Sequence, residues 1–289
     1  SEVLPLFKSL AGLVVILLLA IFAFKKEMLS ESGTLAAIVM GAAIFVLPVP
    51  PYEGWVWFCL LSLFFLSSSL ATRFKAHAKK EVNADFAKGG VRDFAQVAAN
   101  GAVPLFLAAV YHFYSQPVVF TAFVASLAVV TADTFATEIG VLSKGRPFLV
   151  TSFKRVERGC SGAVSLLGSG AGAAASLFIA FSASFLLSLS SVFAGKPELV
   201  VPGGSPAFFL VVFVAGVAGM FADSLLGATV QVMYFCDSCG KETERKVHKC
   251  GRATRFLRGA KWFDNDVTNL FSAIIGAAIA TALFYLLVC

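Results

Sequence analysis

Charged residues are scarce in this sequence. Asp, Glu, Lys and Arg make up 14 % of its 289 residues, and 58 % of the residues are hydrophobic. Soluble domains carry about 25 % charged residues, so the composition excludes an ordinary soluble protein. The apolar runs follow one another so closely that no large soluble domain fits between them. We therefore predict an all-α polytopic membrane protein.

Cysteine is scarce as well, and several common motifs are missing. The six cysteines lie partly in apolar runs, which excludes a disulfide scaffold. The sequence has no Gly-x4-Gly-Lys-[Ser/Thr] P-loop, no protein-kinase signature and no nucleophile elbow. Any phosphate site must therefore be built from other residues.

The apolar runs have the length of membrane spans. About 20 apolar residues cross a bilayer as a helix, and runs of this kind recur along the whole chain. We expect eight helices, at 4–24, 33–49, 53–72, 94–114, 118–138, 162–190, 207–234 and 267–288, or seven spans if one is re-entrant. They would form a single transmembrane domain over residues 1–289, with a basic Cys/His-containing loop at 235–262.

Basic residues fall into alternate loops. They gather at 25–26, 73–92, 144–158 and 241–261, whereas the loops between carry almost none. This regularity follows the positive-inside rule, and it places the basic loops on one face, cytoplasmic or stromal, and both termini on the other. Topology therefore explains the net charge of +6 better than a nucleic-acid partner does.

Three carboxylates interrupt the apolar runs, namely Asp133, Glu138 and Asp223. A charge at membrane depth is costly, so each acid indicates either a functional site or an ion pair with a buried Lys or Arg. Asp133 and Glu138 diverge by about 140° on an ideal helix. They can serve one site only if the helix ends or unwinds near Gly140.

Two further patterns place polar groups and glycines on helix faces. Asp93, Gln96 and Asn100 form a polar stripe that enters the membrane, either as a site wall or as a hydrogen-bonded seam between helices. Gly219, Asp223, Gly227 and Gln231 recur at every fourth residue. This second face predicts close approach of a ligand or of another helix.

Two polar segments could bind ions outside the spans. Lys154 and Arg155, followed by Gly159, Ser161 and Gly162 at an expected helix start, suit a phosphate, although such a loop can also serve topology alone. Before the last run, Asp264 and Asp266 can share a hard cation, and Asn265 and Asn269 fall on one helical face. Asn265 or Asp266 could instead cap the helix.

The basic loop contains a third polar pattern. Cys236-x2-Cys239-x8-His248-x-Cys250 offers four ligands of the zinc type, although its second half departs from finger spacing. Free or redox-active thiols are the alternative. In either case we expect this group to stabilise the loop rather than to form the reaction centre.

Several motifs together resemble one known family. They are Asp133-Thr134-x3-Glu138-Ile139-Gly140, Gly159-x-Ser161-Gly162, Cys236-x2-Cys239-Gly240 and Trp262-x-Asp264-Asn265-Asp266-x2-Asn269. In their order they resemble an integral-membrane family typified by plant phytyl-phosphate kinase. The family pattern Asp-Thr-Trp-Ala-Ser-Glu continues here with Phe135, Ala136 and Thr137, and Cys160 stands where Thr is common. These differences spare the carboxylates.

The resemblance implies a membrane kinase that converts an isoprenoid monophosphate to its diphosphate with CTP or ATP and Mg²⁺, in tocopherol or quinone synthesis. The phosphorylated lipid would be phytyl, farnesyl or geranylgeranyl phosphate, and the enzyme would lie in a plasma membrane or a chloroplast membrane. Such chemistry needs mainly alignment and charge neutralisation. No nucleic-acid partner is implied.

We assign roles to the candidate residues on this basis. Mg²⁺ and the nucleotide phosphates would bind the acids Asp133, Glu138, Asp223, Asp264 and Asp266. Phosphates would bind Lys154, Arg155 and the segment from Gly159 to Gly162, with a pocket wall of Asp93, Gln96, Asn100, Gly227, Asn265 and Asn269. The small-residue faces after Gly162 and around Gly219 would admit the prenyl chain.

A different class of protein uses intramembrane acids too. An ion- or proton-coupled transporter could use Asp133, Glu138 and Asp223 as its path. It would be expected to carry polar residues across the whole membrane, but the far halves of these helices are almost entirely apolar. A one-sided site favours an enzyme, and a non-catalytic lipid-binding protein would leave the acids without a role.

Overall fold

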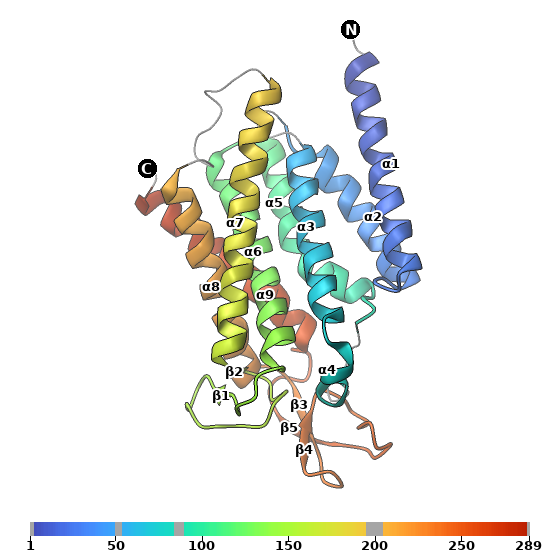
Figure 1. Ribbon diagram of the computed structural model, residues 1–289, viewed down its shortest axis with the longest axis vertical. Helices are drawn as coiled ribbons and strands as arrows, with labels where there is room; N and C mark the ends of the chain where they lie inside the picture. The colour runs from blue at the N-terminus through green and yellow to red at the C-terminus, as the bar shows by residue number, and fades with distance from the viewer. Residues whose placement is uncertain (1–2, 50–53, 84–89, 195–204, 288–289) are drawn as a thin grey trace.

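The computed structural model describes residues 3–49, 54–83, 90–194 and 205–287 (Figure 1). These residues fold into a helical bundle with short strands at one end. The helices are α1 Val3–Lys25, α2 Glu31–Val46, α3 Gly54–Arg73, α4 Ala76–Asn83, α5 Phe94–Phe113, α6 Pro117–Gly140, α7 Leu166–Ala194, α8 Pro206–Thr229 and α9 Asn265–Leu287. The strands are β1 Phe148–Leu149, β2 Ala163–Val164, β3 Met233–Cys236, β4 Lys241–Thr243 and β5 Arg255–Arg258. The expected all-α membrane class is confirmed.

Six helices of the described chain are long and apolar enough to cross a bilayer. They are α3, α5, α6, α8, α9 and the segment Leu166–Val192 of α7. Two more apolar helices are shorter, Leu10–Lys25 within α1 and the whole of α2. These two occupy the first two predicted spans, so the total of eight spans stays a prediction.

The structure corrects two predicted helix boundaries. The helix expected at 162–190 begins instead at Leu166, because Gly162 has a φ of +79° and Ala163–Val164 pairs antiparallel with β1. The helix expected at 207–234 ends at Thr229, since the chain then enters β3. The apolar pattern also fails to predict α4, which is short and polar.

Helix α6 lies at the centre of the bundle. Its most apolar window is 83 % buried, whereas the corresponding windows of the other five long helices are at most 50 % buried. It packs against α3, α5, α7, α8 and α9. Three hydroxyl side chains in this buried stretch, Thr121, Ser126 and Thr131, each donate to a carbonyl three or four residues earlier in α6. The hydroxyl groups of this buried stretch are therefore satisfied within α6 itself.

An aromatic cluster joins α3, α5 and α6 in the core. The fully buried Trp57 ring lies 4.9 Å from Tyr111, 5.2 Å from Phe120 and 4.3 Å from Phe123, measured between centroids. Aromatic pairs at such distances contribute about 0.5–1.5 kcal/mol beyond the burial of their area. This cluster fixes α5 against α6 and so positions the polar groups further along both helices.

The basic segments gather toward one end of the bundle. In Figure 1, α1 begins and α9 ends at the upper end, whereas α4, the β1–β2 pair and the β3–β5 sheet lie at the lower end. The turn between α1 and α2 and the start of α5 lie nearer mid-height, on the right. We call the lower end the polar end, and the functional candidates lie toward it.

Candidate functional site

A polar cavity of about 330 Å³ lies among the helices at the polar end. Its walls come from α5, α6, α7, α8, the start of α9 and the segment between β1 and α7. The candidate residues that line it are Gln96, Asn100, Asp133, Glu138, Gly159, Ser161, Gly162, Asp223, Asp264, Asn265, Asp266 and Asn269. Residues that are far apart in the sequence therefore converge on one space.

Asp133 and Asp223 meet where α6 packs against α8. Gly219 permits this approach, because a Cβ atom there would collide with Val129 of α6. The two carboxyl groups are close enough to interact electrostatically. Oδ2 of Asp223 is buried and has no hydrogen-bond partner among the described residues. Because a buried polar atom without a protein partner needs another one, this pair is suited to hold a divalent cation.

Glu138 has a partner of a different kind. Its Oε2 atom lies 2.5 Å from Nζ of Lys79, a fully buried side chain on α4. Lys79 also donates to the carbonyls of Ala71 and Thr72 at the end of α3. For Glu138, the structure thus shows the ion pair that the sequence left open as an alternative to a functional role. Sequence reasoning missed Lys79, which reads as one more loop cation.

The polar stripe on α5 divides into two roles. Asp93 is the N-cap of α5, since its Oδ1 accepts the backbone N–H of Gln96 at 2.9 Å and its own N–H donates to Gln96 Oε1 at 3.2 Å. Gln96 and Asn100 line the cavity, whereas Asp93 is not among its lining residues. Asp93 therefore caps α5, and its expected binding role stays a prediction.

The cations at the cavity differ from those that the sequence suggested. Lys154 and Arg155 are exposed and do not line it, and Arg155 lies over the ring of Phe148. Arg92 and Arg158 line the cavity instead. Both were missed, although each directly precedes a residue that was singled out. Their positions beside Asp93 and Gly159 were the available signal.

Arg92 is held on several sides. Its guanidinium lies 5.5 Å from the ring centroid of Phe64 and 5.6 Å from that of Phe65, and its backbone pairs with residues just before α2. Burial lowers the pKa of Arg92 to about 10, while Glu138 acts in the opposite direction. The side chain is thus protonated at neutral pH and presents a fixed positive charge.

The segment from Gly159 to Gly162 forms a tight turn rather than a helix start. Gly159 has a φ of +84° and Gly162 a φ of +79°, a region that glycine adopts without strain. A Cβ atom on Gly162 would also collide with Ala228 of α8. Ser161 Oγ donates to Gln231 Oε1 at 2.9 Å. The turn therefore places backbone and hydroxyl groups at the cavity wall, without the helix dipole that was expected.

The start of α9 combines capping with cavity lining. Asp264 is the cap, because its Oδ1 accepts the N–H of Val267 at 3.1 Å, whereas the sequence had suggested Asn265 or Asp266. Asp264, Asn265, Asp266 and Asn269 all line the cavity. Asp264 and Asp266 thus bring two more carboxylates to the space that Asp133 and Asp223 share.

Several glycines of the predicted small-residue faces serve helix packing. Gly219 of α8 packs against α6, as described above. A Cβ atom on Gly172 of α7 would likewise collide with Met220 and with the carbonyl of Ala132. Gly227 does not line the cavity, and its carbonyl accepts a hydrogen bond from Arg258 at 2.9 Å. Gly172 and Gly219 thus contact neighbouring helices, whereas a Cβ atom on Gly170 of α7 would meet nothing within 4 Å, and the role of these faces in admitting a prenyl chain stays a prediction.

A second cavity, of about 80 Å³, lies among α1, α2, α3 and α5. Its lining is almost entirely apolar and includes Ile44, Phe58 and Phe64. It shares Arg92, Gln96 and Asn100 with the polar cavity. Polar and apolar spaces therefore adjoin at one wall.

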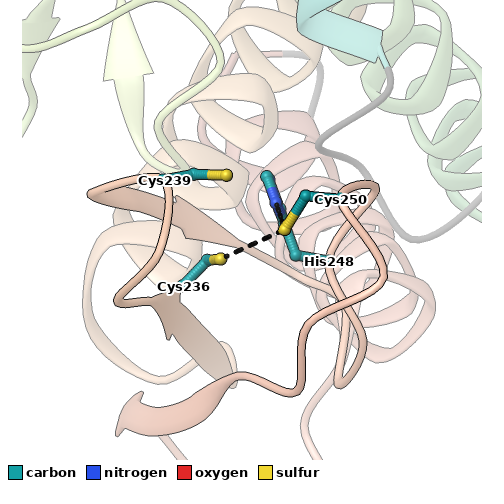
Figure 2. Close-up of side chains that lie close together, drawn as sticks. All are labelled: Cys236, Cys239, His248 and Cys250. Carbon is teal, nitrogen blue, oxygen red and sulfur yellow. Dashed lines mark hydrogen bonds between the residues drawn. The ribbon is translucent and has the colours of Figure 1, made fainter.

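The Cys and His residues of the basic loop form a compact cluster on the β3–β4–β5 sheet (Figure 2). The ligand atoms of Cys236, Cys239, His248 and Cys250 all lie within 4.8 Å of one another.

Cys160, outside this cluster, has its pKa raised to about 11 by burial and by nearby Glu242.

Comparison with known proteins gives a consistent result. The family described as integral membrane protein DUF92 matches residues 14–277. Protein PGR of Arabidopsis thaliana is 28 % identical over 95 % of each chain. Protein VTE6, chloroplastic, of the same plant is 30 % identical over 87 % of this chain and 64 % of its own length. An uncharacterized membrane protein of Methanocaldococcus jannaschii is 29 % identical over 77 % of this chain and 83 % of its own. No solved structure matches the chain.

Proposed function

The chain belongs to the DUF92 family of integral membrane proteins, and on this premise we propose that it is a membrane kinase for isoprenoid monophosphates. It would transfer a phosphoryl group from CTP or ATP to a lipid such as phytyl, farnesyl or geranylgeranyl phosphate. One observation carries the proposal. The cavity of carboxylates and arginines at the polar end adjoins an apolar cavity within the bundle.

The carboxylates supply the cation site that such a reaction needs. Asp133 and Asp223 would hold Mg²⁺, because Asp223 has a buried oxygen without a partner among the described residues. Asp264 and Asp266 lie at the same cavity and can bind the ion or its water molecules. Mg²⁺ would neutralise charge on the nucleotide phosphates. Glu138 supports the site less directly, since Lys79 already neutralises it.

The arginines and the glycine turn would bind the phosphates. Arg92 and Arg158 are the cations that line the cavity in the described chain. A guanidinium group can form two parallel hydrogen bonds with a phosphate. The turn from Gly159 to Gly162 lets the backbone approach closely, because no side chain intervenes at either glycine. No residue has to remove a proton, since the attacking phosphate monoester is already anionic near neutral pH.

The apolar cavity would receive the first part of the isoprenoid chain. A lipid phosphate beside Arg92 would have its chain next to Phe58 and Phe64. A cavity of about 80 Å³ is too small for a whole phytyl chain. The rest of the chain would lie along α1 and α2, whose exposed side chains include Val14, Leu35 and Val39.

The first test is direct assay of the purified protein. Labelled CTP or ATP is incubated with Mg²⁺ and each prenyl monophosphate, and the expected product is the diphosphate. Asp133→Asn and Asp223→Asn are each expected to lower the rate by more than the roughly 10–100-fold that is typical of outer-shell ligands. Glu31→Gln is the matched control, because Glu31 is an exposed carboxylate at the start of α2 that lines neither cavity.

Two results would contradict the proposal. Absence of diphosphate with every nucleotide and lipid pair, together with ion flux in liposomes, would favour the transporter. Full activity of both asparagine variants would remove the carboxylates from the reaction.

A further inference from the structure

The basic loop between α8 and α9 folds around its Cys and His residues. Its three strands pair in the order β4-β3-β5 and have only three or four residues each. So short a sheet buries little apolar surface of its own, and small units of this kind usually need a metal or a covalent link. Cys236 and His248 are nevertheless buried within it, at 0 % and 2 % exposure.

Two backbone turns bring the four side chains together. At the end of β3, the N–H groups of Cys239 and Gly240 both donate to the carbonyl of Cys236, and Gly240 has a φ of +65°. In the second turn, the N–H of Gly251 donates to the carbonyl of His248, and Gly251 has a φ of +79°. Each turn ends in a left-handed glycine and presents two ligands to the same point (Figure 2).

Two of the distances between the ligand atoms match those expected around tetrahedral zinc. Zn–S bonds of about 2.3 Å and Zn–N bonds of about 2.0 Å, at a tetrahedral angle, place two sulfurs about 3.8 Å apart and a sulfur and a nitrogen about 3.5 Å apart. Sγ of Cys236 lies 3.7 Å from Sγ of Cys250, and Nδ1 of His248 lies 3.3 Å from Sγ of Cys250. A disulfide would instead require about 2.05 Å between sulfurs.

The sheet is also joined to the polar cavity. Gln231 Nε2 donates to Oε1 of Glu244, two residues beyond Glu242 and just after β4, at 2.9 Å. Gln231 Oε1 accepts from Ser161 Oγ in the glycine turn. Gln231, Glu244 and Ser161 all line the cavity. A continuous set of hydrogen bonds therefore runs from the Cys and His sheet to the turn from Gly159 to Gly162.

We propose that Cys236, Cys239, His248 and Cys250 bind one structural Zn²⁺, and that this ion holds the cavity wall formed by Glu244, Gln231 and Ser161. Three thiolates and one imidazole favour zinc over harder cations and leave no open coordination position. The ion is thus a structural element distinct from the acidic site. This inference stands whether or not the protein is a kinase, because it concerns metal content and local structure.

Metal analysis of the purified full chain tests the ligand set. We expect about one zinc per chain in the natural sequence and in Cys59→Ser, which removes a cysteine of α3 outside the sheet. Cys236→Ser and His248→Ala should each lose most of the zinc. Should these variants fail to fold, Co²⁺ exchanged into the natural protein should show the sulfur-to-metal absorption of a tetrahedral thiolate site. Substoichiometric zinc without that absorption, or a disulfide among the three cysteines, would overturn the site.

Hydrogen exchange tests the link to the cavity. Removal of zinc from the natural protein by a chelator should increase exchange at 233–258 and also in the glycine turn around Ser161. Exchange in the buried half of α6 serves as the internal control and should stay unchanged. Faster exchange confined to the sheet would still support a zinc site there but would refute its role at the cavity wall.

Discussion

At the scale of single residues, the main finding is that the buried acids differ in their surroundings. Asp223 has an oxygen without a partner among the described residues, whereas Glu138 is bound to Lys79. Asp133, Glu138 and Asp223 are equally evident in the sequence. The sequence does not show which of them forms an ion pair, because Lys79 comes from a helix whose polar sequence carries no membrane signal. Only the packed structure distinguishes a free carboxylate oxygen from a neutralised one.

The Lys79–Glu138 pair should contribute to stability. Lys79→Met removes the cation that contacts Glu138 directly, and breaking a buried pair in this way costs about 3–5 kcal/mol. We expect a marked fall in the thermal unfolding temperature in detergent. The double variant Lys79→Met with Glu138→Gln removes both charges and should recover much of that loss. Equal destabilisation of the single and double variants would show that the pair itself is unimportant.

Cys160 should be a slow nucleophile despite its position at the cavity. Its pKa is raised to about 11 by burial and by Glu242, so the thiol is neutral through the physiological range and ionises only as the pH rises toward that value. Near pH 8 its alkylation by iodoacetamide should be about 100-fold slower than that of an ordinary exposed thiol. Mass spectrometry of the labelled peptides measures this, with Gln116→Cys as an exposed reference. Equal alkylation rates for Cys160 and for the cysteine of Gln116→Cys would show that the pKa of Cys160 is not raised.

At the scale of elements, the sequence predicts the long helices well and their polar ends poorly. Apolar length alone locates α3, α5, α6 and α9 to within about three residues. The start of α7 depends on the turn at Gly162 and on the pairing of β1 with β2, and the end of α8 depends on β3, which pairs with β4 and β5. Strands of two to four residues leave no clear pattern in the sequence, and the misplaced helix start follows from that.

The capping role of Asp93 gives a test at this scale. Asparagine caps a helix about as well as aspartate, whereas alanine does not and costs about 1 kcal/mol. Asp93→Asn should therefore keep both stability and activity, and Asp93→Ala should lose stability. The thermal unfolding temperature and the rate in the phosphoryl-transfer assay are measured for both variants and compared with those of the unchanged chain. Loss of activity in a stable Asp93→Asn variant would support the binding role that the sequence suggested.

At the scale of the whole molecule, the alternation of basic loops predicts the arrangement of the bundle. The helices alternate in direction, and the described basic segments lie toward the polar end (Figure 1). Convergence of the acids at that end follows from the same alternation. The alternation does not identify Arg92 and Arg158 as the cations that line the cavity. Loop cations near a membrane look alike in sequence, and only the folded turns decide which of them reach the cavity.

Orientation in the membrane can be measured in cells. Gln116 lies in the exposed turn between α5 and α6, and Lys144 lies in the basic segment after α6. The positive-inside rule predicts that an impermeant maleimide labels Gln116→Cys from outside and labels Lys144→Cys only after the membrane is opened. Labelling is compared with that of the parent chain. The reverse pattern would place the polar end outside.

The burial of α6 has a consequence for synthesis. Three of the helices that enclose it, α7, α8 and α9, follow it in the chain, so they do not yet exist when α6 leaves the ribosome. Its mean hydropathy of 1.9 allows it to enter lipid alone, and its hydroxyl groups already bond within the helix. Helix α6 therefore suits two environments in succession, first the acyl chains of the bilayer and then the packed side chains of α7, α8 and α9.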